Sequence, residues 1–335
     1  MSATPSILFV ILKKNIGSTS GAQMTRLIRK NFIKKTFITA LSTILVTAGS
    51  LYARKDEKQA GTGTELKVYV SIPPLAYFVE RIGANHVSVE TLIDAGNDPH
   101  TYEPTPRKMM ALAQTDVYFS TGMPFEKQLL DKIRGSNPRL VIIETDKGIE
   151  KSAASGINKQ NNIKGNKKGP GHGERGSDPH IWLSPYLIKI QAKNILRGLA
   201  KLDPENSGSY EKNYRYFIRD LDIVHEEINK SLGPYSGRSF MVYHPAFGHF
   251  ADAYGLVQIA IEIKGRDPSS KQLETVIKQS AELDINTIFI EPQFDRKNAQ
   301  VVADSINAKV ISLDPLRKNV LENLEVIAEA IETSF

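Results

Sequence analysis

Apolar positions along this chain follow two patterns that alternate. Short runs rich in Val, Ile, Phe and Tyr are followed by stretches whose apolar residues recur at helical spacing. Such alternation predicts parallel sheets whose strands are connected by covering helices. The predicted strands are residues 67–71, 87–93, 117–120 and 140–144 in the first half, and 240–243, 257–261, 287–290 and 310–313 in the second. We therefore predict an α/β fold with two lobes.

The longest helical pattern lies between the two halves, from Asp203 to Leu232. Asp203–Pro204 is a typical helix start, with Asp as the cap and Pro at the first position. Six apolar residues then follow a 4-3-4-3-4 spacing that places them on one helical face: Tyr210, Tyr214, Phe217, Leu221, Val224 and Ile228. At 1.5 Å per residue the helix would span ~42 Å. We predict a rigid strut packed along both lobes, with a coiled-coil partner as the alternative.

Two stretches depart from this pattern. Residues 1–53 form a leader, and residues 151–177 are rich in Lys, Asn, Gly and Ser, which predicts a mobile loop. The predicted organisation is therefore a leader, an N-terminal lobe over residues 54–202 that contains the loop, a linking helix over 203–232, and a C-terminal lobe over 233–335.

The leader has the parts of a secretory signal. Arg26–Lys35 is a basic segment, and Phe37–Gly49 is an apolar segment too short to span a bilayer, which needs ~20 residues. Small residues follow as cleavage sites. Met24 precedes the basic segment and is a candidate for the true start. This pattern predicts export.

Charge and cysteine content narrow the function classes. The net charge is +6, but the leader holds seven of the 43 basic residues and no acidic one, which leaves 36 basic against 37 acidic residues in the body. The body therefore gives no electrostatic case for binding nucleic acid. The absence of cysteine excludes disulfides, thiolate metal sites and a lipid-modified cysteine. We expect a soluble, monomeric protein of a Gram-negative periplasm.

Four side chains that can bind a metal ion lie next to prolines at predicted strand or loop ends. The tripeptide Asp-Pro-His occurs twice and provides His100 and His180. His244 and Asp314 each end a predicted strand and precede a proline. In open α/β sheets, ligands bind beyond the carboxyl ends of strands. Three imidazoles and one carboxylate suit Zn²⁺ better than Mn²⁺, and four protein ligands leave no open position for an activated water, which favours carriage over catalysis.

Each of these residues also has a structural interpretation. A single loop histidine is more often a surface or capping residue, and Asp314 is also typical of a turn or helix cap. The remaining histidines fit such roles better: His86 in a turn, His225 beside the apolar stripe, His172 in the predicted loop, and His249 on the helix after His244, where it could support a ligand.

Five segments resemble one known family, in its order and from about Glu65 to the end of the chain. They are residues 97–104 (NDPHTYEP), 178–185 (DPHIWLSP), 243–248 (YHPAFG), 291–294 (EPQF) and 313–316 (LDPL). The sequence resembles the metal-binding solute receptors of ABC importers, the zinc/manganese group called cluster A-I. The resemblance implies two α/β lobes joined by one long helix, a metal between them held by His100, His180, His244 and Asp314, and a membrane permease as partner.

The resemblance also bears on the metal. Manganese-type members tend to carry a carboxylate where this chain has His244, which favours zinc. Zinc-type members often have a histidine-rich loop before the second ligand, whereas residues 151–177 are rich in lysine and contain only His172. We expect capture and release with small movements, and weaker binding as the pH falls through the histidine range near 6.5.

Two other functions compete with this one. A periplasmic zinc hydrolase could use Glu291 or Glu103 as general base, although the chain lacks the His-Glu-x-x-His motif. A receptor for a non-metal solute, or an adhesion protein with a structural metal, is the second. A sugar or peptide receptor usually presents aromatic platforms, whereas the single tryptophan, Trp182, lies within a motif and is expected to pack near the site.

Overall fold

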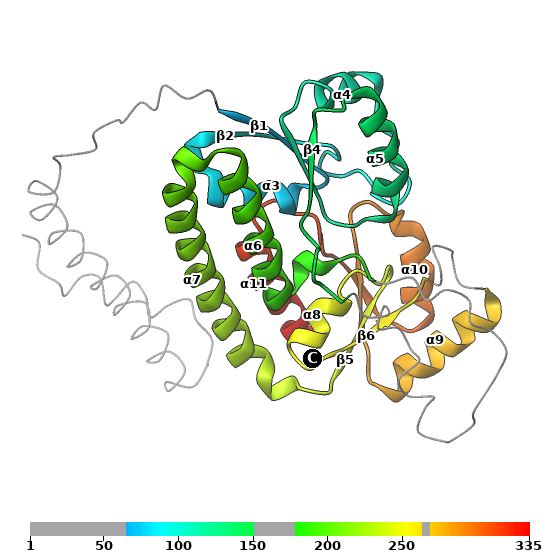
Figure 1. Ribbon diagram of the computed structural model, residues 1–335. Coiled ribbons are helices and arrows are strands. Elements are labelled where there is room, and N and C mark those ends of the chain that lie inside the picture. Colours follow the sequence, from blue (N-terminus) through cyan, green and yellow to red (C-terminus); the bar gives the residue numbers. More distant parts are fainter. Residues whose placement is uncertain (1–64, 151–177, 263–268) are drawn as a thin grey trace, which may run out of the picture. The chain divides into compact units, whose positions relative to one another are not determined.

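The computed structural model describes residues 65–150, 178–262 and 269–335, which belong to one compact unit (Figure 1). The predicted leader and the predicted loop at 151–177 lie outside the described residues. The strands are β1 (Leu66–Val70), β2 (Val87–Thr91), β3 (Val117–Ser120), β4 (Val141–Glu144), β5 (Ser239–Val242), β6 (Val257–Ala260), β7 (Thr287–Ile290) and β8 (Lys309–Ser312). The helices are α3 (Pro73–Gly83), α4 (Pro106–Leu112), α5 (Pro124–Ser136), α6 (Pro185–Leu202), α7 (Ser207–Leu232), α8 (Gly248–Ala253), α9 (Ser270–Glu282), α10 (Arg296–Ser305) and α11 (Val320–Thr333).

The strands form two four-stranded sheets in the orders β2-β1-β3-β4 and β6-β5-β7-β8. Every neighbouring pair is parallel, and the helices provide the crossovers. The predicted α/β class with two sheets is therefore confirmed. In each sheet the strand order reverses beside the first strand, β1 or β5, and such a switch point is where ligands bind in open α/β folds.

Alternate residues of the strands enter different cores, as the period of two requires. Val68 and Val70 of β1 face a central core, whereas Tyr69 faces an outer one. In β5, Phe240 faces the same central core and Met241 a second outer core. The central core therefore joins one face of each sheet to α3, α6, α7 and α11, so that the two lobes share apolar packing.

The linking helix is close to its predicted form. Its apolar stripe is buried at Tyr210, Phe217, Leu221 and Ile228, and the helix packs against α3, α6 and α11. Its start differs, because Pro204–Asn206 forms a 3₁₀ turn before α7. The Asp203 carboxylate accepts hydrogen bonds from the Asn206 amide at 2.8 Å and the Tyr210 hydroxyl at 2.5 Å instead of capping the backbone.

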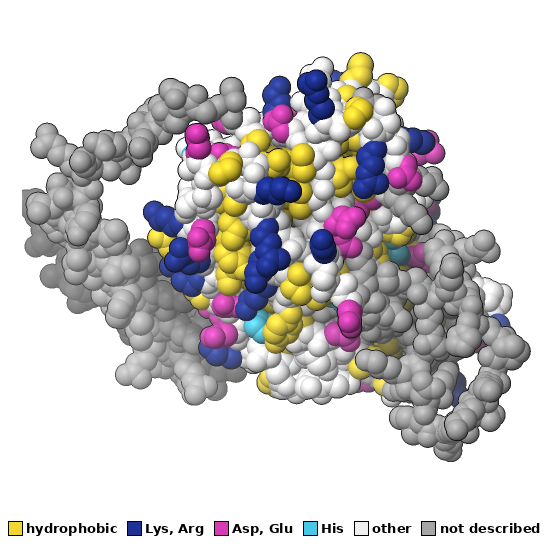
Figure 2. Space-filling model, viewed as in Figure 1, with side chains coloured by type: hydrophobic (Ala, Val, Ile, Leu, Met, Phe, Trp, Pro, Cys, Tyr) yellow, Lys and Arg dark blue, Asp and Glu magenta, His cyan; other side chains and the backbone are white. Residues whose placement is uncertain are grey.

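The opposite face of α7 is solvated. Figure 2 shows Lys and Arg side chains beside a narrow apolar stripe on this face of the molecule. Tyr216 is 46% exposed, and the cationic groups of Lys212 and Arg219 lie 5.9 and 5.2 Å from its ring centroid. Across the described residues, no helix is both long enough and apolar enough to cross a membrane.

Candidate metal centre

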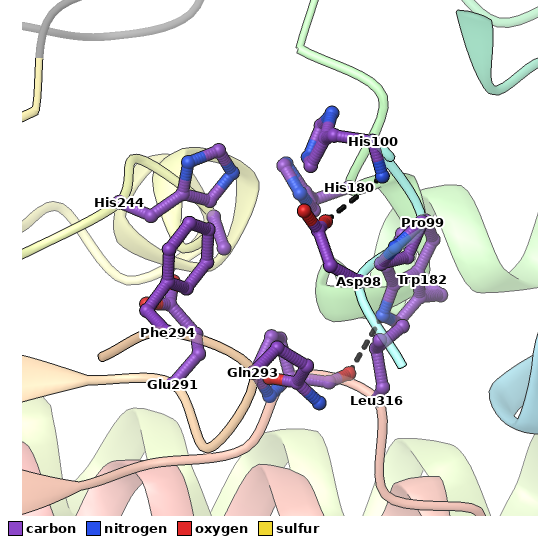
Figure 3. A pocket seen from close by; sticks show the side chains of 12 residues that line it. Asp98, Pro99, His100, His180, Trp182, His244, Glu291, Gln293, Phe294 and Leu316 are labelled. Carbon is purple, nitrogen blue, oxygen red and sulfur yellow. Dashed lines mark hydrogen bonds between the residues drawn. The ribbon is translucent and has the colours of Figure 1, made fainter. Parts of the chain in front are cut away.

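Three histidines from distant parts of the chain meet between the lobes (Figure 3). One ring nitrogen each from His100, His180 and His244 lies within 4.8 Å of the other two. In a tetrahedral shell with Zn–N bonds of 2.0–2.1 Å, such nitrogens would be ~3.4 Å apart. Shifts of about one ångström would therefore close the three imidazoles around a single ion.

The repeated Asp-Pro-His tripeptide forms the same turn in both places. The Asp98 carboxylate accepts a hydrogen bond from the His100 backbone N–H at 2.8 Å, and Asp178 does the same for His180 at 2.9 Å. Proline between them fixes the backbone and cannot compete as a donor. Each tripeptide therefore presents its imidazole at the tip of a tight turn.

The orientation of His180 is fixed by Asp178. The Asp178 carboxylate lies 2.7 Å from His180 Nδ1, and both side chains are buried. Burial raises the pKa of Asp178, but the hydrogen bond and charge of His180 outweigh it and leave the pKa lowered. The ionised Asp178 accepts a hydrogen bond from His180 Nδ1–H, so the free lone pair of the imidazole is on Nε2, which is the tautomer a metal ligand needs.

His244 is held in the same way by Glu262. The residue follows β5, and its Nδ1 lies 2.7 Å from the Glu262 carboxylate, with the side chains 12% and 6% exposed. The Phe294 ring stacks on the imidazole at 5.0 Å between centroids. Within the described part of the chain, His244 Nε2 is buried and has no hydrogen-bond partner. A buried unpaired nitrogen is costly unless a ligand uses it.

Sequence reasoning missed the role of Glu262. It follows the predicted strand at residues 257–261 directly, so its place at the carboxyl end of a strand was a usable signal. It was overlooked because it does not stand in any of the motif segments.

Glu291, considered above as a general base, also lines the cavity. Its side chain is buried, and neither carboxylate oxygen has a hydrogen-bond partner within the described residues. Burial raises its pKa to about 8, against the lowering effect of the charge at His244. This raised pKa favours the protonated form of Glu291. Glu103, the other base considered, lines a neighbouring groove instead.

Asp314 lies outside the group of three histidines. Its Oδ1 accepts hydrogen bonds from the Gln293 side chain at 3.1 Å and from the Leu316 backbone N–H at 2.9 Å. This is the turn interaction that the sequence offered as the structural interpretation of Asp314. Its assignment as the fourth ligand stays a prediction.

The other predicted positions can be located too. Trp182 packs at the site as expected. Its indole N–H donates a hydrogen bond to the Pro315 carbonyl at 2.8 Å, and its ring makes a T-shaped contact with His180. His86 ends a 3₁₀ turn before β2. His225 contacts Tyr186 and Tyr254 away from the site. His249 is buried on α8, and His172 lies outside the described residues.

The space between the imidazoles is small, and residues of both lobes line it. The cavity has a volume of about 20 Å³, which suits one ion or one water and not an organic solute. Its wall contains the three histidines together with Asp98, Trp182, Glu291, Phe294 and Leu316.

The family model for the periplasmic component A of zinc-uptake complexes, ZnuA, matches residues 68–333. The chain belongs to this family. A member from Bacillus subtilis, the high-affinity zinc uptake system protein ZnuA, is 29% identical over 84% of this chain and 87% of its own length. A putative metal-binding protein from Chlamydia muridarum is 27% identical over 87% of this chain and 98% of its own length.

Solved structures agree with the ZnuA assignment. A crystal structure of ZnuA shares 36% identity, with a TM-score of 0.72 over 81% of this chain and 99% of the other. A ZnuA deletion variant with zinc bound shares 37% identity, with the same TM-score. The predicted resemblance to zinc/manganese solute receptors of ABC importers is thus confirmed, and with it the arrangement of two lobes joined by a long helix.

Proposed function

We propose that this protein captures Zn²⁺ in the periplasm with His100, His180 and His244 and delivers it to the membrane permease of an ABC importer. The observation that carries the proposal is the convergence of three imidazoles within 4.8 Å. In two of them Nδ1 is bonded to a buried carboxylate, so Nε2 remains for the metal. The description of the family and a relative named for zinc uptake support the same cargo.

A carrier fits this site better than a hydrolase. Catalytic zinc sites keep an open position for water and need room for a substrate, whereas this cavity holds about 20 Å³. Three nitrogen ligands favour Zn²⁺ over Mn²⁺, which prefers oxygen. Export by the signal in residues 1–53 and action as a monomer belong to the same proposal.

Metal titration tests the proposal. The mature protein would be stripped of metal and titrated with Zn²⁺ and Mn²⁺ in competition with a chromophoric chelator, beside a His100→Ala/His244→Ala double variant. We expect one tightly bound Zn²⁺ per chain, weaker Mn²⁺ binding, and loss of tight binding in the double variant. No stoichiometric zinc, or full binding in the double variant, would overturn the assignment.

The fourth ligand needs a separate variant. Asp314 is our candidate, and binding would require its carboxylate to leave Gln293 and Leu316. Asp314→Asn keeps the size and one oxygen acceptor but removes the charge. A fall of about tenfold or more in zinc affinity is expected if Asp314 joins the metal. Unchanged affinity would mean that three histidines and a non-protein ligand complete the shell.

A further inference from the structure

A buried histidine outside the proposed ligand set contacts the segment that holds His180. His249 lies on α8, and its side chain is 5% exposed. Its Nε2 lies 3.1 Å from the main-chain oxygen of Asp178 and 4.0 Å from the Asp178 carboxylate. Because a carbonyl oxygen can only accept, Nε2 of His249 carries the proton and donates it.

Asp178 connects this contact to the His180 ring. One carboxylate oxygen of Asp178 lies 2.9 Å from the His180 backbone nitrogen and 2.7 Å from its Nδ1. The position of residue 178 therefore determines where the imidazole points. A chain of contacts leads from α8 through Asp178 to a proposed ligand.

The same short helix is joined to the turn that carries His244. The Phe247 backbone N–H donates to the Gln258 side chain at 2.7 Å, and the Ala251 N–H donates to the Phe247 carbonyl at 2.9 Å. The first bond ties the turn after β5 to Gln258 of β6, and the second joins this turn to the start of α8. His244 and His249 are thus parts of one piece of backbone.

We propose that His249 is a positioning residue that holds His180 in register with His244. The ring centroids of His180 and His244 lie 5.4 Å apart. The hydrogen bond of His249 to Asp178 links α8 to the turn at residues 178–180. The sequence led us to expect that His249 supports a metal ligand. In the structure it contacts Asp178, the residue that is hydrogen-bonded to His180. Its effect on zinc rests on the function proposed above, whereas its effect on the His180 ring exists without metal.

Three substitutions at residue 249 separate the effect of the Nε2–H hydrogen bond from the effect of ring packing. His249→Phe keeps a flat ring and removes the N–H. His249→Gln carries an amide N–H at about the reach of Nε2, whereas the N–H of His249→Asn stops near the position of Nδ1 and should not reach Asp178. His225→Phe is the control, because His225 bonds to Tyr186 and Tyr254 and not to the 178–180 turn.

The first readout is ¹⁵N-histidine NMR of the metal-free protein. In the wild type and His249→Gln we expect a slowly exchanging Nδ1–H signal from His180, as its bond to Asp178 requires. In His249→Phe and His249→Asn that signal should broaden or vanish. The second readout is zinc affinity, expected to fall about tenfold or more in these two variants and to recover in His249→Gln.

Each outcome has one meaning. If His249→Phe lowers the melting temperature of the metal-free protein but leaves the His180 signal and zinc affinity unchanged, His249 only packs and the proposal is overturned. If His249→Gln behaves like His249→Phe, the donor is not the cause and the proposal also fails. If His249→Phe does not fold, His249→Asn takes its place. A wild type without stoichiometric zinc overturns the proposed function, and the metal-free NMR comparison still decides the role of His249.

Discussion

The imidazoles of His100, His180 and His244 differ in pKa. Burial, together with the charges of His244 and His180, lowers the pKa of His100 to about 4. Burial also lowers the pKa of His180, although Asp178 opposes it. For His244, burial acts downward but is outweighed, first by the hydrogen bond to Glu262, so its pKa is raised. As the pH rises, His244 is therefore the last of the three to become a neutral ligand.

This order predicts the pH dependence of zinc binding. Because Zn²⁺ needs the neutral imidazole, affinity should be constant above the raised pKa of His244 and fall about tenfold per pH unit below it. His100 and His180 are already neutral there and add to the slope only at lower pH. The bend should therefore lie above the ordinary histidine value of 6.5, because the pKa of His244 is raised. Chelator competition from about pH 5 to about pH 9 measures the curve.

Glu262→Gln tests the cause of the bend. Removing the carboxylate charge takes away the main support for protonated His244, so the bend should move to lower pH. The plateau affinity should fall as well, about tenfold or more, because the charged acceptor of the Nδ1–H is replaced by a weaker, neutral amide oxygen. A bend that stays in place would show that another group titrates.

At the scale of elements, local rules predicted most of the framework. In the sequence, Thr105–Pro106 and Ser184–Pro185 have the same form as Asp203–Pro204, and they stand at the starts of α4 and α6, because proline fits only the first turn of a helix. The eight predicted strands are the eight that form the two sheets of the described residues, with ends that differ by at most two residues. Asp203–Pro204 also marks a helix start, but of a 3₁₀ turn that leads into α7, and the Asp203 side chain bonds to Tyr210 instead of making the expected cap.

The site was less predictable than the framework. Proline-bounded loop ends pointed to the three histidines, because strand ends of parallel sheets gather at one edge. Their outer partners depend on which strands neighbour one another. β6 lies beside β5, and only this pairing brings Glu262 to His244. In the same way, the Asp314 turn bonds to Gln293 because β7 lies beside β8, which sequence spacing does not reveal.

The tight approach of α6 to the first sheet gives a prediction about stability. A Cβ added at Gly198 would clash with Ile143 of β4 and lie 3.0 Å from Phe119 of β3, whereas one added at Gly208 of α7 would meet nothing within 4 Å. Alanine favours a helix over glycine by about 1 kcal/mol, but overpacking costs ~1–3 kcal/mol. Gly198→Ala should therefore destabilise the fold and Gly208→Ala stabilise it by up to about 1 kcal/mol. Urea unfolding of the metal-free protein measures both, and equal effects would contradict the packing argument.

Across the whole molecule, the two lobes are not independent bodies. Phe240 of the second sheet, Val70 of the first and Phe217 of α7 belong to one buried cluster. The Trp182 indole bonds across the interface to the Pro315 carbonyl, and Lys318 lies 2.7 Å from Glu80 of α3. A wide opening would separate these apolar surfaces, at about 25 cal/mol for each Å² exposed to water. Movement on metal binding should therefore stay within the loops.

Hydrogen–deuterium exchange with and without Zn²⁺ distinguishes movement of the loops from a wide opening of the two lobes. We expect zinc to slow exchange in the turns that carry the histidines, above all in residues 94–105, where His100 is the most exposed of the three. Amides in α7 should exchange at the same rate in both states, since its contacts with α3, α6 and α11 do not involve the metal. Zinc should also raise the melting temperature, because a ligand at 1,000 times its dissociation constant adds about 4 kcal/mol to the free energy of unfolding. The His100→Ala/His244→Ala variant is the control and should show neither change. If zinc altered exchange along α7 and the central core instead, the lobes would be separating as rigid bodies, and the shared core would have to be a feature of the closed state alone.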